Sequence, residues 1–125
     1  MSNQMLNLLQ TKSEEIADIS YSYYTELLNK KCNYSVASQI LRSATSIGAN
    51  IYEASGTFSD KDFRHCLIVS YKEGKETKWW INFFKRNNLL SEKECNLLFE
   101  KTDEVCRILY KTIKSSLNNQ ISAIE

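Results

Sequence analysis

The arrangement of side chains most suggestive of a metal enzyme is Asp62 followed by His65. A carboxylate and an imidazole three residues apart share one face of a helix, and di-iron bundles bind metal through such pairs. Those sites need two histidine-containing pairs, whereas this chain has a single histidine. We therefore expect His65 to be an ordinary polar residue, with no metal and no cofactor. Glycine-rich phosphate loops, nucleophile elbows and HExxH motifs are also missing, so we expect no catalytic residue and no enzymatic activity.

Cysteines are the other side chains capable of chemistry. The chain has four, Cys32, Cys66, Cys95 and Cys106, and no two of them form a CxxC pair. Isolated cysteines within helical patterns are typical of reduced thiols in the core of a cytosolic protein. The alternative is a disulfide or a metal site, which this spacing disfavours.

Composition favours long helices. The 125 residues include no proline and only three glycines, so few residues interrupt a helix or form the many turns of a sheet. The length is that of one domain, residues 1–125. No stretch approaches the roughly 20 apolar residues that span a bilayer, and the first residues do not resemble a signal peptide. We expect a single all-α domain in the cytoplasm, without membrane contact.

Hydrophobic periodicity predicts four helices. The first covers about residues 4–30, the second includes 39–55, the third covers 60–86 and the fourth runs from about residue 92 to Leu117. Links of a few residues leave no room for a crossover, so neighbouring helices must run antiparallel. The sequence therefore predicts an antiparallel up-down-up-down four-helix bundle. The polar tail, 118–125, is expected to be frayed.

Particular residues mark the predicted helix ends. Ser35 and Ser59 are the expected N-caps of helices two and three, and Ser91 begins a capping box for helix four. Gly56 is expected to close helix two in the left-handed conformation. The pair 87–88, two asparagines, supplies the break after helix three because asparagine tolerates that conformation.

A polar stripe follows helix two. At about 100° per residue its members share an arc of roughly 80°. They are Gln39, Arg42, Ser46, Asn50 and Glu53. The stripe is either a solvated face or a contact in which Asn50 and Glu53 hydrogen-bond to a neighbouring helix or subunit. Gly48, on the same helix, offers a place where another helix can approach closely.

A basic stripe follows helix three, although the net charge of the chain is only +1. Its members also share an arc of about 80°. They are Lys61, Arg64, Lys72, Lys75 and Arg86. Because Trp79 lies on the same arc, the stripe suits phosphate contacts combined with base stacking. The alternatives are a subunit interface or a solvated face on which Lys72 and Glu76 form an exposed ion pair.

Aromatic residues are concentrated near the end of helix three. Trp80, Ile81 and Phe84 are expected to face the core, whereas Trp79 and Phe83 point away from it. These two are the candidates for an interface with another chain.

The corner between helices two and three carries a family resemblance. The pattern comprises Gln39-Ile40-Leu41-Arg42, then Ser46 to Glu53, then Gly56, Ser59 and Phe63, with Glu73, Glu76, Thr77 and Trp80 further on. It resembles the four-helix-bundle family of 23S rRNA intervening-sequence proteins. Members usually carry Arg-Arg in place of Leu41-Arg42, Glu-Gly in place of Glu53-Ala54 and Gly-Arg in place of Gly56-Thr57. Two basic side chains are therefore missing from this corner.

The resemblance implies a small bundle encoded within inserted segments of 23S rRNA genes, with homopentamers among its members. Related bundles are accessory proteins of diversity-generating retroelements, which bind nucleic acid and a reverse transcriptase. We therefore expect a homo-oligomer, a pentamer by resemblance, that binds RNA or DNA through the basic stripe and Arg42. The alternative is an interaction scaffold that docks a partner protein, such as a reverse transcriptase, on the exposed aromatics without binding nucleic acid.

Overall fold

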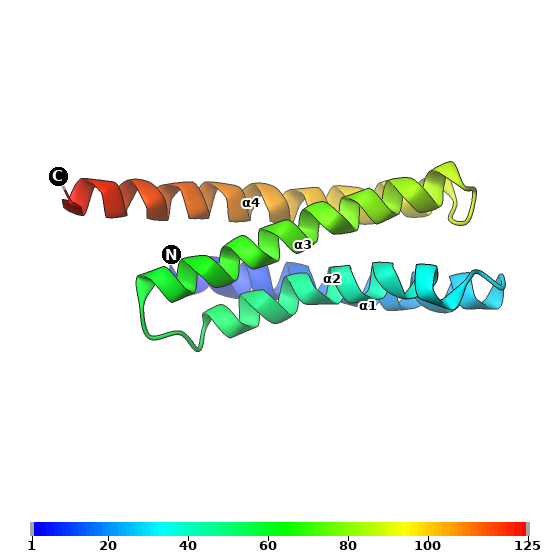
Figure 1. Cartoon of the computed structure of the whole chain (residues 1–125), viewed down its shortest axis with the longest axis horizontal. Helices are drawn as coiled ribbons and strands as arrows, with labels where there is room; N and C mark the ends of the chain where they lie inside the picture. The colour runs from blue at the N-terminus through cyan, green and yellow to red at the C-terminus, as the bar shows by residue number, and fades with distance from the viewer. Residues whose placement is uncertain (1, 125) are drawn as a thin grey trace.

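The computed structural model describes residues 2–124, and this part of the chain contains four α-helices and no strand (Figure 1). They are α1 (Asn3–Asn29), α2 (Tyr34–Ala54), α3 (Asp60–Arg86) and α4 (Glu92–Ile124). The predicted all-α class is confirmed. Within the same residues, none of the helices has an apolar stretch long enough to cross a membrane.

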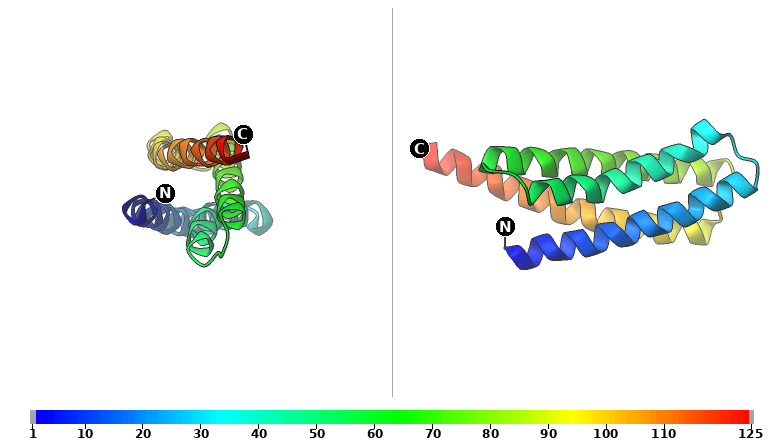
Figure 2. Two further views of the ribbon diagram at one scale, coloured as in Figure 1. Left: turned by 90° about the vertical axis from the view of Figure 1, so that its left-hand side faces the viewer. Right: turned by 90° about the horizontal axis from the view of Figure 1, so that it is seen from below.

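The four helices form a ring in which each packs against its two neighbours. Contacts join α1 to α2, α2 to α3, α3 to α4 and α4 to α1, whereas within the described residues no Cα atoms of diagonally opposite helices lie within 8 Å of each other. Viewed from one end, α4 lies on one side of the bundle, α1 and α2 lie on the opposite side, and α3 is beside both (Figure 2, left). Short connections make consecutive helices antiparallel, as predicted for an up-down-up-down bundle.

Two of the predicted helix starts are confirmed by their hydrogen bonds. At α3, Ser59 Oγ accepts from the Asp62 backbone N–H at 3.1 Å. At α4, Ser91 Oγ accepts from the Glu94 N–H at 3.1 Å, and Glu94 Oε1 accepts from the Ser91 N–H at 3.0 Å. The second arrangement is a reciprocal capping box, which satisfies two backbone donors at once.

The predicted cap of α2 is wrong. Asn33, rather than Ser35, is the N-cap, and its Oδ1 accepts from the Val36 N–H at 3.2 Å. Ser35 lies inside the first turn of the helix. Both residue types cap helices well, so the sequence alone does not decide between neighbours two positions apart.

The left-handed residues also differ from expectation. Gly56 does not adopt a positive φ, and α2 ends with Ser55 in the right-handed region. Positive φ occurs instead at Lys31, at 62°, and at Asn88, at 56°. The role of Asn88 is as predicted, whereas a left-handed lysine costs about 1–2 kcal/mol and has no signal in the sequence.

Paired backbone hydrogen bonds stabilise both left-handed turns. After α1, the Cys32 N–H donates to Leu27 O at 3.0 Å and the Lys31 N–H donates to Leu28 O at 3.0 Å. After α3, the Leu89 N–H donates to Phe84 O at 2.9 Å. These bonds satisfy carbonyls at the helix ends that would otherwise have no partner, in the pattern of a Schellman motif.

Helix α4 is longer than predicted. It continues to Ile124, past the expected end at Leu117, and its C-terminal end projects beyond the other helices (Figure 1). The tail is polar, but it contains no glycine or proline that would stop a helix. The last residue of the predicted tail, Glu125, lies outside the described residues.

Apolar side chains from all four helices fill the interior. The largest fully buried ones are Leu9, Ile16, Leu27, Ile40, Ile47, Ile51, Leu67, Ile81, Phe84, Leu98, Val105 and Leu109. They recur at three- and four-residue intervals, as expected for helices with one apolar face. Burying each such side chain contributes roughly 1.5–3 kcal/mol, so this core provides the main stabilisation of the bundle.

All four cysteines are free thiols. Cys95 and Cys106 are buried, and Cys32 and Cys66 are half-buried. Burial raises the pKa of the Cys95 and Cys106 thiols above the ordinary value. Both thiols therefore stay protonated and unreactive at neutral pH, in agreement with the prediction of reduced core cysteines.

Two glycines allow helices to approach closely. A Cβ atom at Gly48 would lie 3.0 Å from Ser13 Oγ, so α1 approaches α2 at the predicted position. A Cβ atom at Gly74 would overlap the Cys106 sulfur, and it would contact Ile47 Cδ1 at 3.9 Å. Gly74 therefore lets α3 pack against α4, a role that sequence analysis missed.

We predict that Gly74→Ala lowers the free energy of unfolding by about 1–3 kcal/mol, because the added methyl group must displace a buried sulfur. Gly56→Ala is the matched control, since its Cβ would meet only Glu53 O, at 3.5 Å. This control should be neutral or slightly stabilising. Urea unfolding measures both variants. If Gly74→Ala were as stable as the wild type, the close packing of α3 on α4 would be wrong.

Candidate functional site

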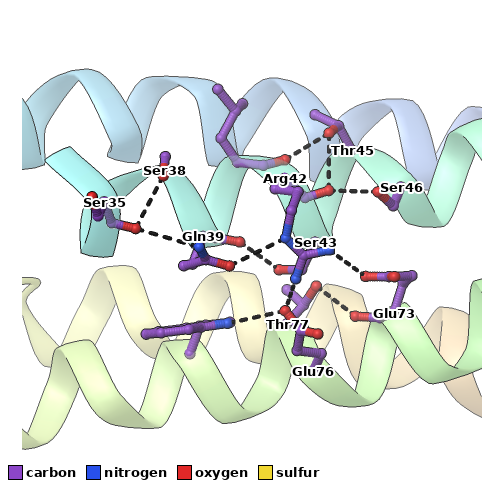
Figure 3. Close-up of polar contacts among 12 residues, drawn as sticks. Ser35, Ser38, Gln39, Arg42, Ser43, Thr45, Ser46, Glu73, Glu76 and Thr77 are labelled. Carbon is purple, nitrogen blue, oxygen red and sulfur yellow. Dashed lines mark hydrogen bonds and ion pairs between the residues drawn. The ribbon is translucent and has the colours of Figure 1, made fainter.

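The polar stripe of α2 faces α3 through Arg42. The guanidinium contacts two carboxylates of α3, with Nη1 3.3 Å from Glu73 Oε2 and Nη2 paired with Glu76 Oε2 (Figure 3). Its Nε donates to Gln39 Oε1 at 3.1 Å, within α2. A planar guanidinium has donors for all three contacts, so one side chain links the two helices at several points.

The same network holds an aromatic side chain. Glu76 Oε2 also accepts from Trp80 Nε1 at 3.1 Å, which satisfies the indole N–H of this half-buried residue. Glu76 pairs with Arg42, and the alternative of an exposed Lys72–Glu76 ion pair is not observed among residues 2–124. The family-like residues Gln39, Arg42, Glu73, Glu76 and Trp80 thus form one connected set within the chain.

The rest of the α2 stripe bonds within its own helix. Ser46 Oγ donates to Arg42 O at 2.7 Å, and Asn50 Nδ2 donates to Ser46 O at 2.7 Å. Glu53 is exposed, and its side chain makes no hydrogen bond or ion pair to any residue in 2–124. The predicted link from Asn50 and Glu53 to a neighbouring helix of the same chain is not present among these residues.

Four members of the predicted basic stripe lie on the outer face of α3. Lys61, Lys72, Lys75 and Arg86 are all exposed. Trp79 lies among them and is 53% exposed. This part of the prediction places cations and an aromatic ring on one surface, as expected from the helical projection.

Arg64 is the exception, because it is buried. Its side chain turns towards α4, where Nη1 donates to Ser116 Oγ at 3.2 Å, and it is only 8% exposed. The prediction that Arg64 belongs to an exposed stripe is therefore wrong. Arg64 lies at the edge of the projected arc. At such a position, a small rotation of α3 determines whether the side chain faces solvent or the adjacent helix.

Helix α4 adds aromatic and basic groups that sequence analysis missed. The rings of Tyr71 on α3 and Tyr110 on α4 lie 6.0 Å apart, and Lys114 Nζ lies 5.9 Å from the centre of the Tyr110 ring. Tyr110 is 49% exposed. Residues 110 and 114 lie one turn apart on the same face of the helix, and this spacing could have indicated the pair. It was overlooked because the charges of the helix sum to zero.

Other cations of this region are compensated by an acid. Lys78 Nζ lies 2.7 Å from Asp103 Oδ1, and Arg107 Nε lies 3.1 Å from Asp103 Oδ2. The hydrogen bond from Lys78 holds the pKa of Asp103 below its usual range, so this carboxylate stays charged. Lys78 and Arg107 are therefore less available to an external anion than Lys72 and Lys75.

Aromatic side chains form a continuous cluster on α3. Trp79 stacks on Phe83 with ring centres 5.7 Å apart and an interplanar angle of 18°, and Trp80 meets Trp79 edge-on at 4.8 Å. Ile81 and Phe84 are buried as predicted. Phe83, expected to point away from the core, is half-buried against it, so Trp79 is the main exposed ring.

The described residues do not provide a metal site. No group of three or more histidine, cysteine, aspartate or glutamate side chains within residues 2–124 could hold an ion. His65, which was considered above as a possible metal ligand together with Asp62, is exposed.

We predict that Arg42→Met lowers the free energy of unfolding by about 1 kcal/mol, because it leaves two neighbouring carboxylates without their cation. The magnitude is modest because the ion pairs are partly exposed to water. Lys85→Met is the control, since Lys85 Nζ lies 3.9 Å from the exposed Glu92 and its loss should change little. Chemical denaturation compares the two variants. Equal effects would show that the Arg42 network does not stabilise the bundle.

Comparison with known proteins relates the chain to a family. The family model of the 23S rRNA-intervening sequence protein matches residues 6–111. No curated protein is significantly similar to the chain.

A solved structure supports the same relationship. It is the 1.70 Å crystal structure of a protein with unknown function from the S23 ribosomal protein family of Bacteroides thetaiotaomicron VPI-5482. The two sequences are 33% identical, the alignment covers 88% of this chain and 98% of the other, and the TM-score is 0.84. Since the family model matches most of the chain, the protein belongs to the 23S rRNA-intervening sequence protein family.

Proposed function

We propose that the protein is a non-enzymatic bundle that binds RNA or DNA through a basic face formed by α3 and α4. The basic face is defined by Lys61, Lys72, Lys75 and Arg86 of α3 with Lys114 of α4. Arg42 and Arg64, included by sequence analysis, are left out of this face because one is paired with two carboxylates and the other is buried.

The main support for this function is that the acids near Lys72 and Lys75 pair with cations outside the basic face, which leaves these lysines without acidic partners among the described residues. None of the α3 cations on the basic face forms an ion pair with a described residue. The acids beside Lys72 and Lys75 are already occupied, because Glu73 and Glu76 contact Arg42 and Asp103 contacts Lys78. A chain with a net charge of +1 thereby retains an uncompensated positive surface, which suits a phosphate backbone.

Exposed rings add a second kind of contact. Trp79 lies among the cations of α3, and Tyr110 lies beside Lys114. Stacking of a nucleic-acid base on such a ring contributes about 1–3 kcal/mol and tolerates many sequences. The combination favours single-stranded regions, whose bases are free to stack.

The proposal includes self-association, with a pentamer suggested by the family resemblance. Trp79 is a large ring more than half exposed, and its stacking on Phe83 makes an apolar surface typical of an interface. Repeating a weak basic face in an oligomer increases the total affinity for one nucleic-acid strand.

A second candidate function is docking of a partner protein, such as a reverse transcriptase, on the same aromatic surface. The half-exposed Trp79 favours this alternative, because tryptophan is enriched among residues that dominate protein interfaces. The two candidates differ in their dependence on salt. Phosphate contacts weaken steeply as salt rises, whereas an apolar interface responds little.

For nucleic-acid binding, we predict that Lys72→Glu with Lys75→Glu abolishes retention of single-stranded RNA in a low-salt filter assay. In the wild type, the logarithm of affinity should fall with the logarithm of salt by about 0.7 for each phosphate contact. Lys93→Glu is the control, because Lys93 is an exposed cation in the first turn of α4 that does not belong to the basic face. RNA retention that is absent in the wild type, or unaffected by the double variant, would contradict the proposal.

For self-association, we predict that Trp79→Ala converts a multimer into smaller species in light scattering at micromolar concentration. Removal of a central interface tryptophan often costs at least about 2 kcal/mol, or roughly thirtyfold in affinity. Tyr21→Ala is the matched control, because Tyr21 is a 63% exposed aromatic on α1. A wild-type monomer, or a multimer equally sensitive to both substitutions, would refute the role of Trp79.

A further inference from the structure

A cavity opens at the end of the bundle where α1 and α3 begin and α4 ends. Its volume is about 740 Å³, and its wall includes the first residues of α3 and a long stretch of α4 up to Gln120. Because α4 continues beyond Leu117, Asn119 and Gln120 extend the wall past the predicted end of the helix.

The wall of this cavity contains a buried cation. Arg64 is 8% exposed, and it forms no ion pair with a carboxylate in residues 2–124. Its one hydrogen bond among these residues runs from Nη1 to Ser116 Oγ. A guanidinium has five N–H donors, and a buried charge without an anionic partner is costly. Arg64 therefore has donors and charge available for a ligand in the cavity.

The surrounding groups favour an anion. Lys61 and Lys111 also line the cavity, against one lining acid, Asp60, so three cations face one carboxylate. Ser116 accepts the bond from Arg64, which leaves its own hydroxyl hydrogen free to donate. Ser115 and Asn119 supply further donors on the same wall. Arginine with several neutral donors is a common arrangement for phosphate recognition.

We propose that this cavity binds a phosphate group, with Arg64 as its central contact and Lys111 and Ser116 as additional ones. The phosphate belongs either to a small phosphorylated compound or to the backbone of a nucleic acid. The cavity shares only Lys61 with the basic face and does not include Lys72 or Lys75, so phosphate binding there can be tested apart from nucleic-acid binding by the basic face.

Thermal unfolding in sodium phosphate, compared with sodium chloride at equal ionic strength, tests the site. A ligand that binds only the folded state raises the melting temperature with its concentration. We expect this rise for the wild type and not for Arg64→Gln, with phosphate binding at least about tenfold weaker in the variant.

Lys111→Gln, at an exposed wall position, tests the cavity without disturbing a buried residue and should weaken binding severalfold. Lys93→Gln is the control and should behave like the wild type.

The source of the phosphate is distinguished by repeating RNA retention with Lys111→Gln. Reduced retention assigns the cavity to a backbone phosphate, and unchanged retention together with a phosphate-specific rise in melting temperature assigns it to a small compound. Either result supports the site. A melting temperature that responds equally to phosphate and chloride, or a phosphate effect that Lys111→Gln and Lys93→Gln alter equally, overturns the proposal.

Discussion

Helices α2 and α3 share the most extensive contact in the bundle, and this contact positions the other helices. In the interior, Ser70 Oγ donates to the carbonyl of Ile47 at 2.8 Å, which requires the two helix backbones to lie close together. At the surface, Arg42 joins Glu73 and Glu76 about one to two turns along the same contact. Together these bonds fix the rotation of α3 about its axis. That rotation determines which side chains of α3 face outward and which face α4.

The α2–α3 contact also sets the distribution of charge. Acids on α3 hold Arg42, and Asp103 of α4 holds Lys78, so Lys72 and Lys75 remain without anionic partners within residues 2–124. Residues that resemble the family pattern, such as Gln39, Arg42 and Trp80, therefore have an architectural role within one chain. The residues proposed to bind a ligand lie outside this pattern. The family-like residues influence them only by fixing the orientation of α3.

Much of the fold could be predicted from the sequence, because helix periodicity and capping are local properties. Ser59 and Ser91 marked helix starts correctly, and the absence of proline favoured long helices. The wrong predictions concern side chains whose exposure depends on packing between helices. The projection placed Arg64 at the edge of an arc, but only the packing of α4, with Ser116 beside it, determined its burial. The lysine and tyrosine of α4 that adjoin α3 were missed because a sequence does not show which helix faces combine.

We propose that the outer face of α3 contacts nucleic acid, while the Arg42 network holds the bundle together. Ultraviolet crosslinking of the wild-type protein to single-stranded RNA, followed by mass spectrometry of the peptides, tests which surface contacts RNA. We expect crosslinks at Trp79 on α3 and at Tyr110 on α4, because both are exposed rings beside lysines that form no ion pair with any residue of 2–124. Crosslinks confined to residues 39–53 of α2, or no crosslinked peptide at low salt, would contradict it.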